Sequence, residues 1–270
     1  MGAPPAEWIV FSSARSGDGD LYALQPKTGE LRLVVGSPEA EGGGRFDAAR
    51  DRLIYQRFGE PTILMSSGEK VLDDLAGDAA PVWSPDGERI AYSARRRGQE
   101  NLYVARIDGR QEEQLTSGPA SDRYPAWSPD GSELVFARRL ETGWDLHAIA
   151  LGGQAPEVRR LTRRGVYVGH PAWSPDGRSI AFDTSFDGEI EIARLDLATG
   201  RVERLTRRPG NDLVPAWSRD GKSLAFGGES EGDWELWLLE LASGRLTRLT
   251  ESEGFDGGPV FVPADVLRKR

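Results

Sequence analysis

The sequence contains no cysteine, only two histidines and no apolar run that approaches 18 residues. Without cysteine the chain has no disulfide, no thiolate nucleophile and no cysteine-ligated zinc site. Two histidines, His147 and His170, exclude a three-histidine metal site. The short apolar runs exclude a membrane-spanning helix. The first five residues lack the basic and apolar regions of a secretory signal, so the compartment stays open between the cytoplasm and an exported location.

The charge balance disfavours two classes of partner. Lys and Arg number 34 against 43 Asp and Glu, which gives a formal net charge of -9. Nucleic acids and anionic membrane surfaces both attract basic proteins, so we expect no nucleic-acid partner and no membrane insertion. The 38% hydrophobic content supports a globular core, and 33 Gly with 17 Pro indicate an all-β chain with many turns.

A repeat of about 44 residues covers most of the chain. The motif Trp-Ser-Pro-Asp-Gly begins at Trp83, Trp127 and Trp173, and Trp-Ser-Arg-Asp-Gly begins at Trp217. Each Trp is followed by an aromatic residue nine positions later, by an aliphatic residue nineteen positions later, and by Leu-Thr at the end of the unit. Turn residues divide each unit into four β segments, which is the pattern of a β-propeller blade.

The two ends of the chain complete one another. Phe261 occupies the Trp position of a new unit just before the C-terminus, whereas Phe11 and Leu21 fit the later positions of a unit that lacks its first strand. Phe46 marks a further, degenerate unit. A linear β solenoid is the alternative, but the split unit argues against it because joining the ends removes exposed sheet edges.

The sequence therefore predicts one domain, residues 1–270: an all-β, six-bladed propeller of four-stranded blades, closed by the C-terminal strand joining the N-terminal blade. We place the blades at about 7–36 plus 256–263, 41–74, 78–117, 122–163, 168–207 and 212–251.

The motif Pro-Ala-Trp-Ser-Pro-Asp-Gly, followed by Ile-Ala-Phe and Leu-Thr, resembles the WD40-like repeat of TolB-type propellers over about residues 7–263. The resemblance implies a protein-binding propeller and favours a periplasmic or secreted location. TolB proteins carry an additional N-terminal α/β domain, for which this sequence has no residues. The same repeat forms the propeller of prolyl-oligopeptidase-like peptidases, but no hydrolase domain is present. We therefore expect a stand-alone propeller.

Two repeat positions supply candidate site residues on the face that carries the longer loops. The position five before each Trp or its equivalent is acidic in five of six units: Glu41, Asp78, Asp122, Asp212 and Asp256. Symmetry would place these carboxylates in a ring at the channel mouth, as a cation site or a socket for a basic group. The alternative is a local role, in which each Asp accepts backbone N–H bonds within its own loop.

The position three before Trp departs from small residues at Tyr124 and His170, and Arg123 and Tyr167 stand nearby in the sequence. We predict that these four residues form a ligand-binding patch together with Asp122, Asp212 and Asp256. The alternative is that their side chains only fill space at the channel rim.

No nucleophile constellation is present, and we assign no catalytic residue. The leading hypothesis is a monomeric, non-enzymatic module that binds a protein or peptide on the loop face. It needs no cofactor, although a divalent cation such as calcium in the channel is left open. The rival is a metal-assisted enzyme of the glycan lyase or lactonase kind, with its site at the channel mouth.

Overall fold

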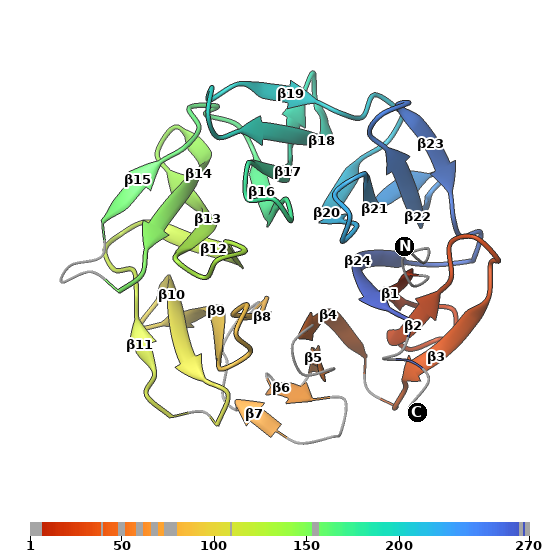
Figure 1. Cartoon of the computed structure of the whole chain (residues 1–270), viewed down its shortest axis with the longest axis horizontal. Helices are drawn as coiled ribbons and strands as arrows, with labels where there is room; N and C mark the ends of the chain where they lie inside the picture. The colour runs from red at the N-terminus through yellow and green to blue at the C-terminus, as the bar shows by residue number, and fades with distance from the viewer. Residues whose placement is uncertain are drawn as a thin grey trace, which may run out of the picture.

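The computed structural model describes residues 7–38, 40–47, 52–57, 62–65, 70–72, 80–108, 110–152, 157–264 and 267. Within these residues the strands form six four-stranded antiparallel sheets around a central axis (Figure 1). From the innermost strand outwards the sheets are β24 (Asp256–Pro263), β1 (Glu7–Ser13), β2 (Asp20–Leu24) and β3 (Leu31–Val35); β4 (Glu41–Asp47), β5 (Arg52–Arg57), β6 (Thr62–Met65) and β7 (Lys70–Leu72); β8 (Val82–Trp83), β9 (Arg89–Arg96), β10 (Gln99–Arg106) and β11 (Glu113–Gln114); β12 (Ser121–Trp127), β13 (Glu133–Leu140), β14 (Gly143–Ala150) and β15 (Val158–Arg160); β16 (Val168–Trp173), β17 (Ser179–Phe186), β18 (Glu189–Asp196) and β19 (Val202–Arg204); β20 (Asp212–Trp217), β21 (Ser223–Ser230), β22 (Asp233–Glu240) and β23 (Arg245–Arg248).

Five of these sheets use consecutive strands, and the sixth combines the two ends of the chain. Strand β24 pairs antiparallel with β1, from Glu7 opposite Pro263 to Ser13 opposite Asp256. In Figure 1 the C-terminal strand lies inside the three N-terminal strands and completes their blade. The predicted fold class, an all-β propeller closed by the C-terminal strand, is confirmed.

The repeated Ser-x-Asp-Gly segment forms the turn between the first and second strands of a blade. In the blade of β12 and β13, the Ser128 hydroxyl donates to Asp130 at 2.6 Å and accepts the Glu133 N–H at 3.0 Å. Asp130 accepts the Ser132 N–H, and Gly131 takes a positive φ of 73° that favours glycine. Hydrogen bonds from Ser128 and Ser132 lower the pKa of the exposed Asp130 carboxyl to about 2. These repeated polar residues therefore build the turn, which explains their recurrence.

The repeated tryptophans join neighbouring blades. The indole N–H groups of Trp83, Trp127, Trp173 and Trp217 donate to backbone carbonyls of the preceding blade's inner strand at 3.0–3.3 Å. The Trp127 ring also packs between two blades, in one hydrophobic cluster with Leu102 of the preceding blade and Phe136 of its own blade. Burial of these large side chains between sheets supplies much of the packing that holds the blades side by side.

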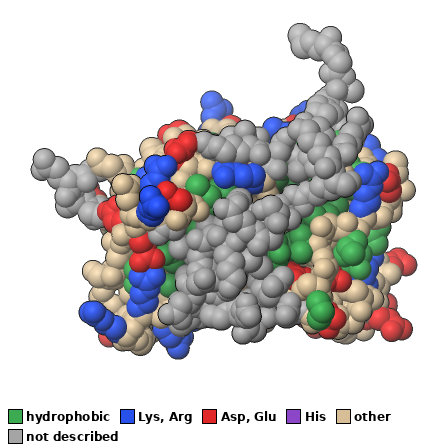
Figure 2. Space-filling view, turned by 90° about the horizontal axis from the view of Figure 1, so that it is seen from below, with side chains coloured by type: hydrophobic (Ala, Val, Ile, Leu, Met, Phe, Trp, Pro, Cys, Tyr) green, Lys and Arg blue, Asp and Glu red, His purple; other side chains and the backbone are tan. Residues whose placement is uncertain are grey.

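Seen from the edge (Figure 2), the visible charged side chains of both signs are interspersed rather than gathered into one patch. Leu31 and Leu33 are exposed on the outermost strand β3. No helix in the described part of the chain is long and apolar enough to cross a membrane.

Candidate binding site at the mouth of the central channel

The innermost strands enclose a cavity of about 650 Å³ along the propeller axis. We call the side with the entry loops of each first strand the loop face, and the side with the Ser-x-Asp-Gly turns the turn face. Prolines, alanines, valines and the Trp173 and Trp217 rings make up most of the wall. Tyr124 and His170, which precede Trp127 and Trp173 by three residues, also line the cavity. A mostly apolar cavity with a few polar side chains is the usual form of a ligand site.

A bulge at the third residue before each Trp position shapes the mouth. All six residues at this position have a positive φ, between 35° and 64°: Gly43, Ala80, Tyr124, His170, Val214 and Gly258. In five of the blades the pairing register between first and second strands shifts across this residue. Positive φ is unfavourable for residues other than glycine, and most of all for a β-branched residue such as Val214. Because the conformation recurs in every blade, it belongs to the architecture, and only the identity of the side chain varies.

Tyr124 and His170 meet across neighbouring blades. Their ring centroids are 4.0 Å apart, with an interplanar angle of 34°. His170 Nδ1 lies 2.8 Å from Oδ2 of Asp183, and the backbone N–H of Val214 donates to the same oxygen at 2.9 Å. These contacts connect the His170 ring, through Asp183, to the first strand of the next blade. Two of the predicted patch residues are therefore in direct contact.

Tyr167 lies beside this pair. Burial raises the pKa of the Tyr167 hydroxyl, and the neighbouring Asp183 carboxylate raises it further. A Cβ atom at Gly169 would come within 2.4 Å of the Tyr167 hydroxyl oxygen and 2.5 Å of Asp183 Oδ1. The close approach of Tyr167 and Asp183 therefore requires glycine at position 169.

Arg123 turns toward the adjacent blade. Its Nε donates to Glu100 at 2.5 Å, and Ser121 donates to the same carboxylate oxygen at 2.6 Å. The guanidinium carbon lies 5.6 Å from the ring centroid of Trp144. The Arg123 side chain is 30% exposed and does not line the cavity.

The predicted acidic residues lie elsewhere. The four that the structure describes, Glu41, Asp122, Asp212 and Asp256, are each at most 1% exposed, and none of them lines the cavity. Asp122 makes a two-pronged ion pair with Arg138, with both contacts at 2.7 Å. Asp212 lies 2.8 Å from Nε of Arg208. The fifth residue, Asp78, lies outside the described residues.

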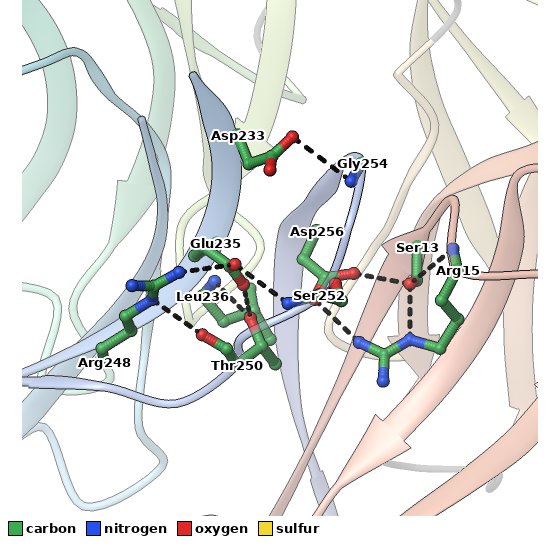
Figure 3. Close-up of polar contacts among 10 residues, drawn as sticks. All are labelled: Ser13, Arg15, Asp233, Glu235, Leu236, Arg248, Thr250, Ser252, Gly254 and Asp256. Carbon is green, nitrogen blue, oxygen red and sulfur yellow. Dashed lines mark hydrogen bonds and ion pairs between the residues drawn. The ribbon is translucent and has the colours of Figure 1, made fainter. Parts of the chain in front are cut away.

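Asp256 and Glu41 have similarly local partners. Asp256 accepts hydrogen bonds from Ser13 at 2.5 Å, Arg15 at 2.7 Å and Ser252 at 2.8 Å (Figure 3). Glu41 accepts the Ser37 hydroxyl. The expectation of an acidic ring at the mouth is thus corrected for these four carboxylates. The physical reason is that these carboxylates are buried at the start of the first strands. A buried carboxylate needs hydrogen-bond or ion-pair partners, which here come from neighbouring segments of the chain.

A divalent cation does not fit the described side chains. No group of three or more His, Asp or Glu residues within the described ranges is arranged to hold a metal ion. Both carboxylate oxygens of Asp122 already contact Arg138, and those of Asp256 already accept hydrogen bonds from Ser13 and Arg15. We therefore derive no step through a metal.

Sequence reasoning missed a second set of buried acids. Asp145, Glu191 and Glu235 precede the aliphatic residue of the third strand, and each is paired with an arginine of the fourth strand. Figure 3 shows Glu235 between Arg248 and Thr250. The sequence did contain a signal for these acids, because Arg-Leu-Thr recurs at the end of three units. The Arg and the Thr of each segment lie opposite the buried acid of the third strand.

Asp183 was also missed. The equivalent residues ten positions after Trp83, Trp127 and Trp217 are Ser93, Ala137 and Gly227. Among these four units, only the one that contains His170 has a carboxylate at this position. A comparison of equivalent positions in the second strands would therefore have found Asp183.

Comparison with known proteins identifies the family. Residues 64–208 and 156–266 match the family described as the TolB beta propeller domain. The chain belongs to this family.

Individual relatives agree with this assignment. A segment of 41 residues, 15% of this chain, is 46% identical to the Protein TolB homolog of Protochlamydia amoebophila and spans 9% of that protein. The crystal structure of TolB from Acinetobacter baumannii superposes with a TM-score of 0.84 and 20% identity, over 97% of this chain and 68% of that one. An oligogalacturonate lyase in complex with manganese gives a TM-score of 0.61 and 18% identity, over 90% and 73%. At these identities, both solved structures show the fold alone.

Proposed function

We propose that this chain is a non-enzymatic binding module that recognises a protein or peptide at the loop-face mouth of its channel. The observation that carries the proposal is the contact between Tyr124 and His170 at the mouth of a 650 Å³ cavity. Both residues replace the small or aliphatic side chains of the other blades. Membership in the TolB propeller family supports a protein partner and a location in the periplasm or outside the cell.

The pair is suited to recognition because its geometry is fixed before binding. Two χ angles define each ring, so little conformational entropy is lost when a ligand covers them. Asp183 is fully buried and holds the His170 ring through Nδ1, and Arg123 is held by Glu100. Side chains locked in this way lose less freedom on binding, which favours affinity.

Affinity capture with variants on the two faces tests the proposal. The wild type, Tyr124→Ala/His170→Ala and Glu88→Ala/Arg178→Ala would each be immobilised and exposed to envelope and cytosolic extracts of the source organism. Alanine already occupies the same bulge position at Ala80, so the first pair should preserve the fold. We expect a partner that binds the wild type and the Glu88/Arg178 variant and is lost from the Tyr124/His170 variant.

Calorimetric titration with the captured partner then gives the size of the effect. We expect a loss of at least tenfold in affinity for the Tyr124/His170 variant and less than twofold for the Glu88/Arg178 variant. The reverse pattern would place the binding face on the side of the Ser-x-Asp-Gly turns and contradict the proposal.

The second candidate is a metal-assisted lyase. Its support is the fold likeness to a lyase whose solved structure contains manganese. Against it stands the lack of a suitable donor group among the described side chains. Metal analysis of the purified protein separates the two: a divalent ion retained in stoichiometric amount after dialysis would favour the lyase.

A further inference from the structure

We propose that the loop face carries a second binding site, which takes arginine side chains from a basic segment of a protein partner. The site lies where the blade of β20–β23 meets the blade that β24 completes. It consists of the Trp234 and Phe255 rings and of the carboxylates in the two loops beside them. It goes beyond the proposed function, because it lies at a different blade junction from Tyr124 and His170.

A short acidic sequence occurs twice at this junction. Glu-Ser-Glu-Gly occupies residues 229–232, where β21 turns into β22, and residues 251–254, in the connection from β23 to β24. An aromatic residue follows each copy, within two positions. The segments 229–234 and 251–255 contain no basic residue, and they carry five acidic ones: Glu229, Glu231, Asp233, Glu251 and Glu253.

The two segments lie side by side in the structure. Trp234 forms a parallel β-bridge with Phe255, and the N–H of Gly254 donates to Asp233 at 3.3 Å (Figure 3). Residues that are more than twenty positions apart in the sequence therefore form one surface on the loop face.

An exposed pair of aromatic rings lies in this surface. The ring centroids of Trp234 and Phe255 are 6.2 Å apart, with an interplanar angle of 45°. Phe255 is 45% exposed, and it is the one aromatic among the exposed large hydrophobic side chains of the described residues. A Cβ atom at Gly257 would come within 2.5 Å of the Phe255 ring, so glycine at this position lets the ring lie against β24. An exposed aromatic surface of this kind is typical of a contact with a partner.

The equivalent tryptophan of another blade already binds an arginine. Trp144 and Trp234 each follow the repeat Trp of their own blade by 17 residues. The guanidinium carbon of Arg123 lies 5.6 Å from the Trp144 ring centroid, and Arg123 pairs with Glu100. The position of Arg123 is taken by Leu213 in the blade of Trp234, so that blade supplies no arginine from this position.

Phe186, at the loop-face end of β17, has the same kind of neighbours. The guanidinium carbon of Arg204 lies 5.2 Å from its ring centroid, and Arg204 pairs with Glu191. Within the part of the chain that the structure describes, none of the arginines that lie over aromatic rings lies over Trp234 or Phe255. This pair therefore combines rings and carboxylates, as at the other two places, without an arginine of the chain itself.

The arginines near the junction have carboxylate partners of their own. Three of them are each paired with a buried acid: Arg15 with Asp256, Arg208 with Asp212, and Arg248 with Glu235. The hydrogen bond with Glu235 is the main cause of the raised pKa of Arg248, and the charges of Glu251 and Glu231 contribute less. The charge of each of these arginines is thus balanced by its own partner.

The acidic residues of the two segments keep their charge. Glu229 accepts a hydrogen bond from the Asn211 side chain at 2.9 Å, and Asp233 accepts the Gly254 N–H; both donors are neutral. Among the described residues, no ion pair involves any of the five acids. The surface around the rings is therefore negatively charged and complementary to a basic partner.

Arginine fits this surface better than lysine does. Its planar guanidinium can stack on an aromatic ring and at the same time donate to a carboxylate, whereas the lysine ammonium acts as a point charge. Five carboxylates on two segments exceed what one cation can neutralise. The ligand is therefore a segment with several basic residues, in which arginine occupies the aromatic pair.

Labelled peptides test the inference on the intact chain. The probe is an N-acetylated, C-amidated octapeptide of alternating Arg and Ala that carries a fluorophore, and two matched probes have Lys or Glu in place of Arg. Fluorescence anisotropy should show that the Arg probe binds about threefold more tightly than the Lys probe and more than about tenfold more tightly than the Glu probe. Binding of the Arg probe should weaken as NaCl is raised from about 50 to about 500 mM.

Variants of the aromatic pair locate the site. Trp234→Ala and Phe255→Ala should each weaken binding of the Arg probe about tenfold and abolish its preference over the Lys probe. Phe255→Ala removes an exposed ring, so it tests the site even if Trp234→Ala is unstable. The matched control is Leu33→Ala, which removes an exposed apolar side chain of β3 and should change affinity less than about twofold.

Charge variants separate the site from general attraction to an acidic protein. Glu251→Gln/Glu253→Gln should weaken binding of the Arg probe about tenfold, and Glu251→Lys/Glu253→Lys should shift the preference toward the Glu probe. Glu113→Gln/Glu157→Gln removes the same charge at two exposed positions in other blades and should change affinity less than about twofold. Circular dichroism melts within about 3 °C of the wild type would establish that each variant is folded.

Three results would overturn the inference: equal binding of the Arg and Lys probes, an equal loss with the Glu113/Glu157 and Glu251/Glu253 glutamine variants, or unchanged binding in both aromatic variants. The capture experiment for the proposed function is read separately. If the captured partner requires Tyr124 and His170 while the Arg probe shows no preference, the proposed function stands and this site is wrong. If the Arg probe behaves as expected while the capture fails, only the proposed function is wrong.

Discussion

Asp212 shows how burial at the start of an inner strand changes the chemistry of one residue. Its carboxylate is fully buried beside Arg208, whose guanidinium lies over the Trp237 ring at 4.4 Å. Burial raises the pKa of the Asp212 carboxyl to about 7, although the Arg208 charge acts in the opposite direction. In the unfolded chain the same carboxyl titrates near 3.8. The folded state therefore holds a proton that the unfolded state releases between these two pH values.

This difference predicts a pH-dependent stability. Because the folded-state pKa is raised, the contribution of Asp212 to stability is greatest at low pH and is lost as the pH rises from about 4 to about 7. Relative to Asp212→Asn, the free energy of unfolding of the wild type should fall by at most about 1.4 kcal/mol per pH unit across this window. Urea denaturation at pH 5, 6, 7 and 8 measures the difference. Asp130→Asn, whose carboxyl is ionised throughout this range, should differ from the wild type by a constant amount. A constant difference for Asp212→Asn as well would show that Asp212 is ionised in the folded protein at pH 5.

At the scale of the strand, the Arg-Leu-Thr segments link the third and fourth strands of a blade through side-chain hydrogen bonds and ion pairs. The Thr206 hydroxyl accepts the Ile192 N–H at 2.9 Å and donates to Glu191 at 2.6 Å, while Arg204 pairs with the same carboxylate. Equivalent bonds occur at Thr162 and Thr250. The threonine therefore satisfies one backbone group and one carboxylate that are both buried.

Replacing this hydroxyl with a methyl group should be costly. Thr206→Val keeps the β-branched shape but leaves the Ile192 N–H and one Glu191 oxygen unsatisfied, which should lower the free energy of unfolding by about 1–3 kcal/mol. Thr247→Val changes an exposed residue of β23 in the same way and should stay within about 0.5 kcal/mol of the wild type. Urea denaturation of both variants provides the comparison. Equal effects would mean that the buried bonds contribute nothing specific.

The strand scale also explains what the sequence could predict. The spacing of Trp and its aromatic and aliphatic companions follows from strand length and turn type, which are local properties, so the blades and their closure were predictable. Tyr124 and His170 were found because they interrupt a pattern. The direction of Asp122 was not predictable, because its partner Arg138 lies on the next strand and the bulge after Arg123 alters the pairing register of the two strands. Spacing along one strand does not contain that information.

At the scale of the whole molecule, stability depends on one pair of strands that joins the two ends of the chain. Strand β24 pairs with β1, and Phe261 packs in a cluster with Ile9 and Phe11. No covalent bond secures this junction, since the sequence has no cysteine. Opening of the ring would expose the edge of β1, as well as the faces of the two blades that pack against β24.

A disulfide across this junction should stabilise the whole propeller. Val10 and Val260 are direct partners in the antiparallel pair, so their Cα atoms lie within the range that a disulfide can bridge. In Val10→Cys/Val260→Cys no native thiol competes for pairing, and the bond closes a loop of nearly the entire chain. The chain-entropy argument gives an upper limit of about 5.5 kcal/mol for a loop of this size, and the typical gain from a disulfide is about 2–4 kcal/mol. Denaturant melts of the oxidised and reduced forms of the same variant provide the measurement, with the reduced form as its own control. The gain should appear only on oxidation, and it should slow unfolding if separation of β24 from β1 is an early step. Identical melts of a fully oxidised and a reduced sample would contradict the predicted gain, whereas an unchanged unfolding rate would show that separation of β24 from β1 is not an early step.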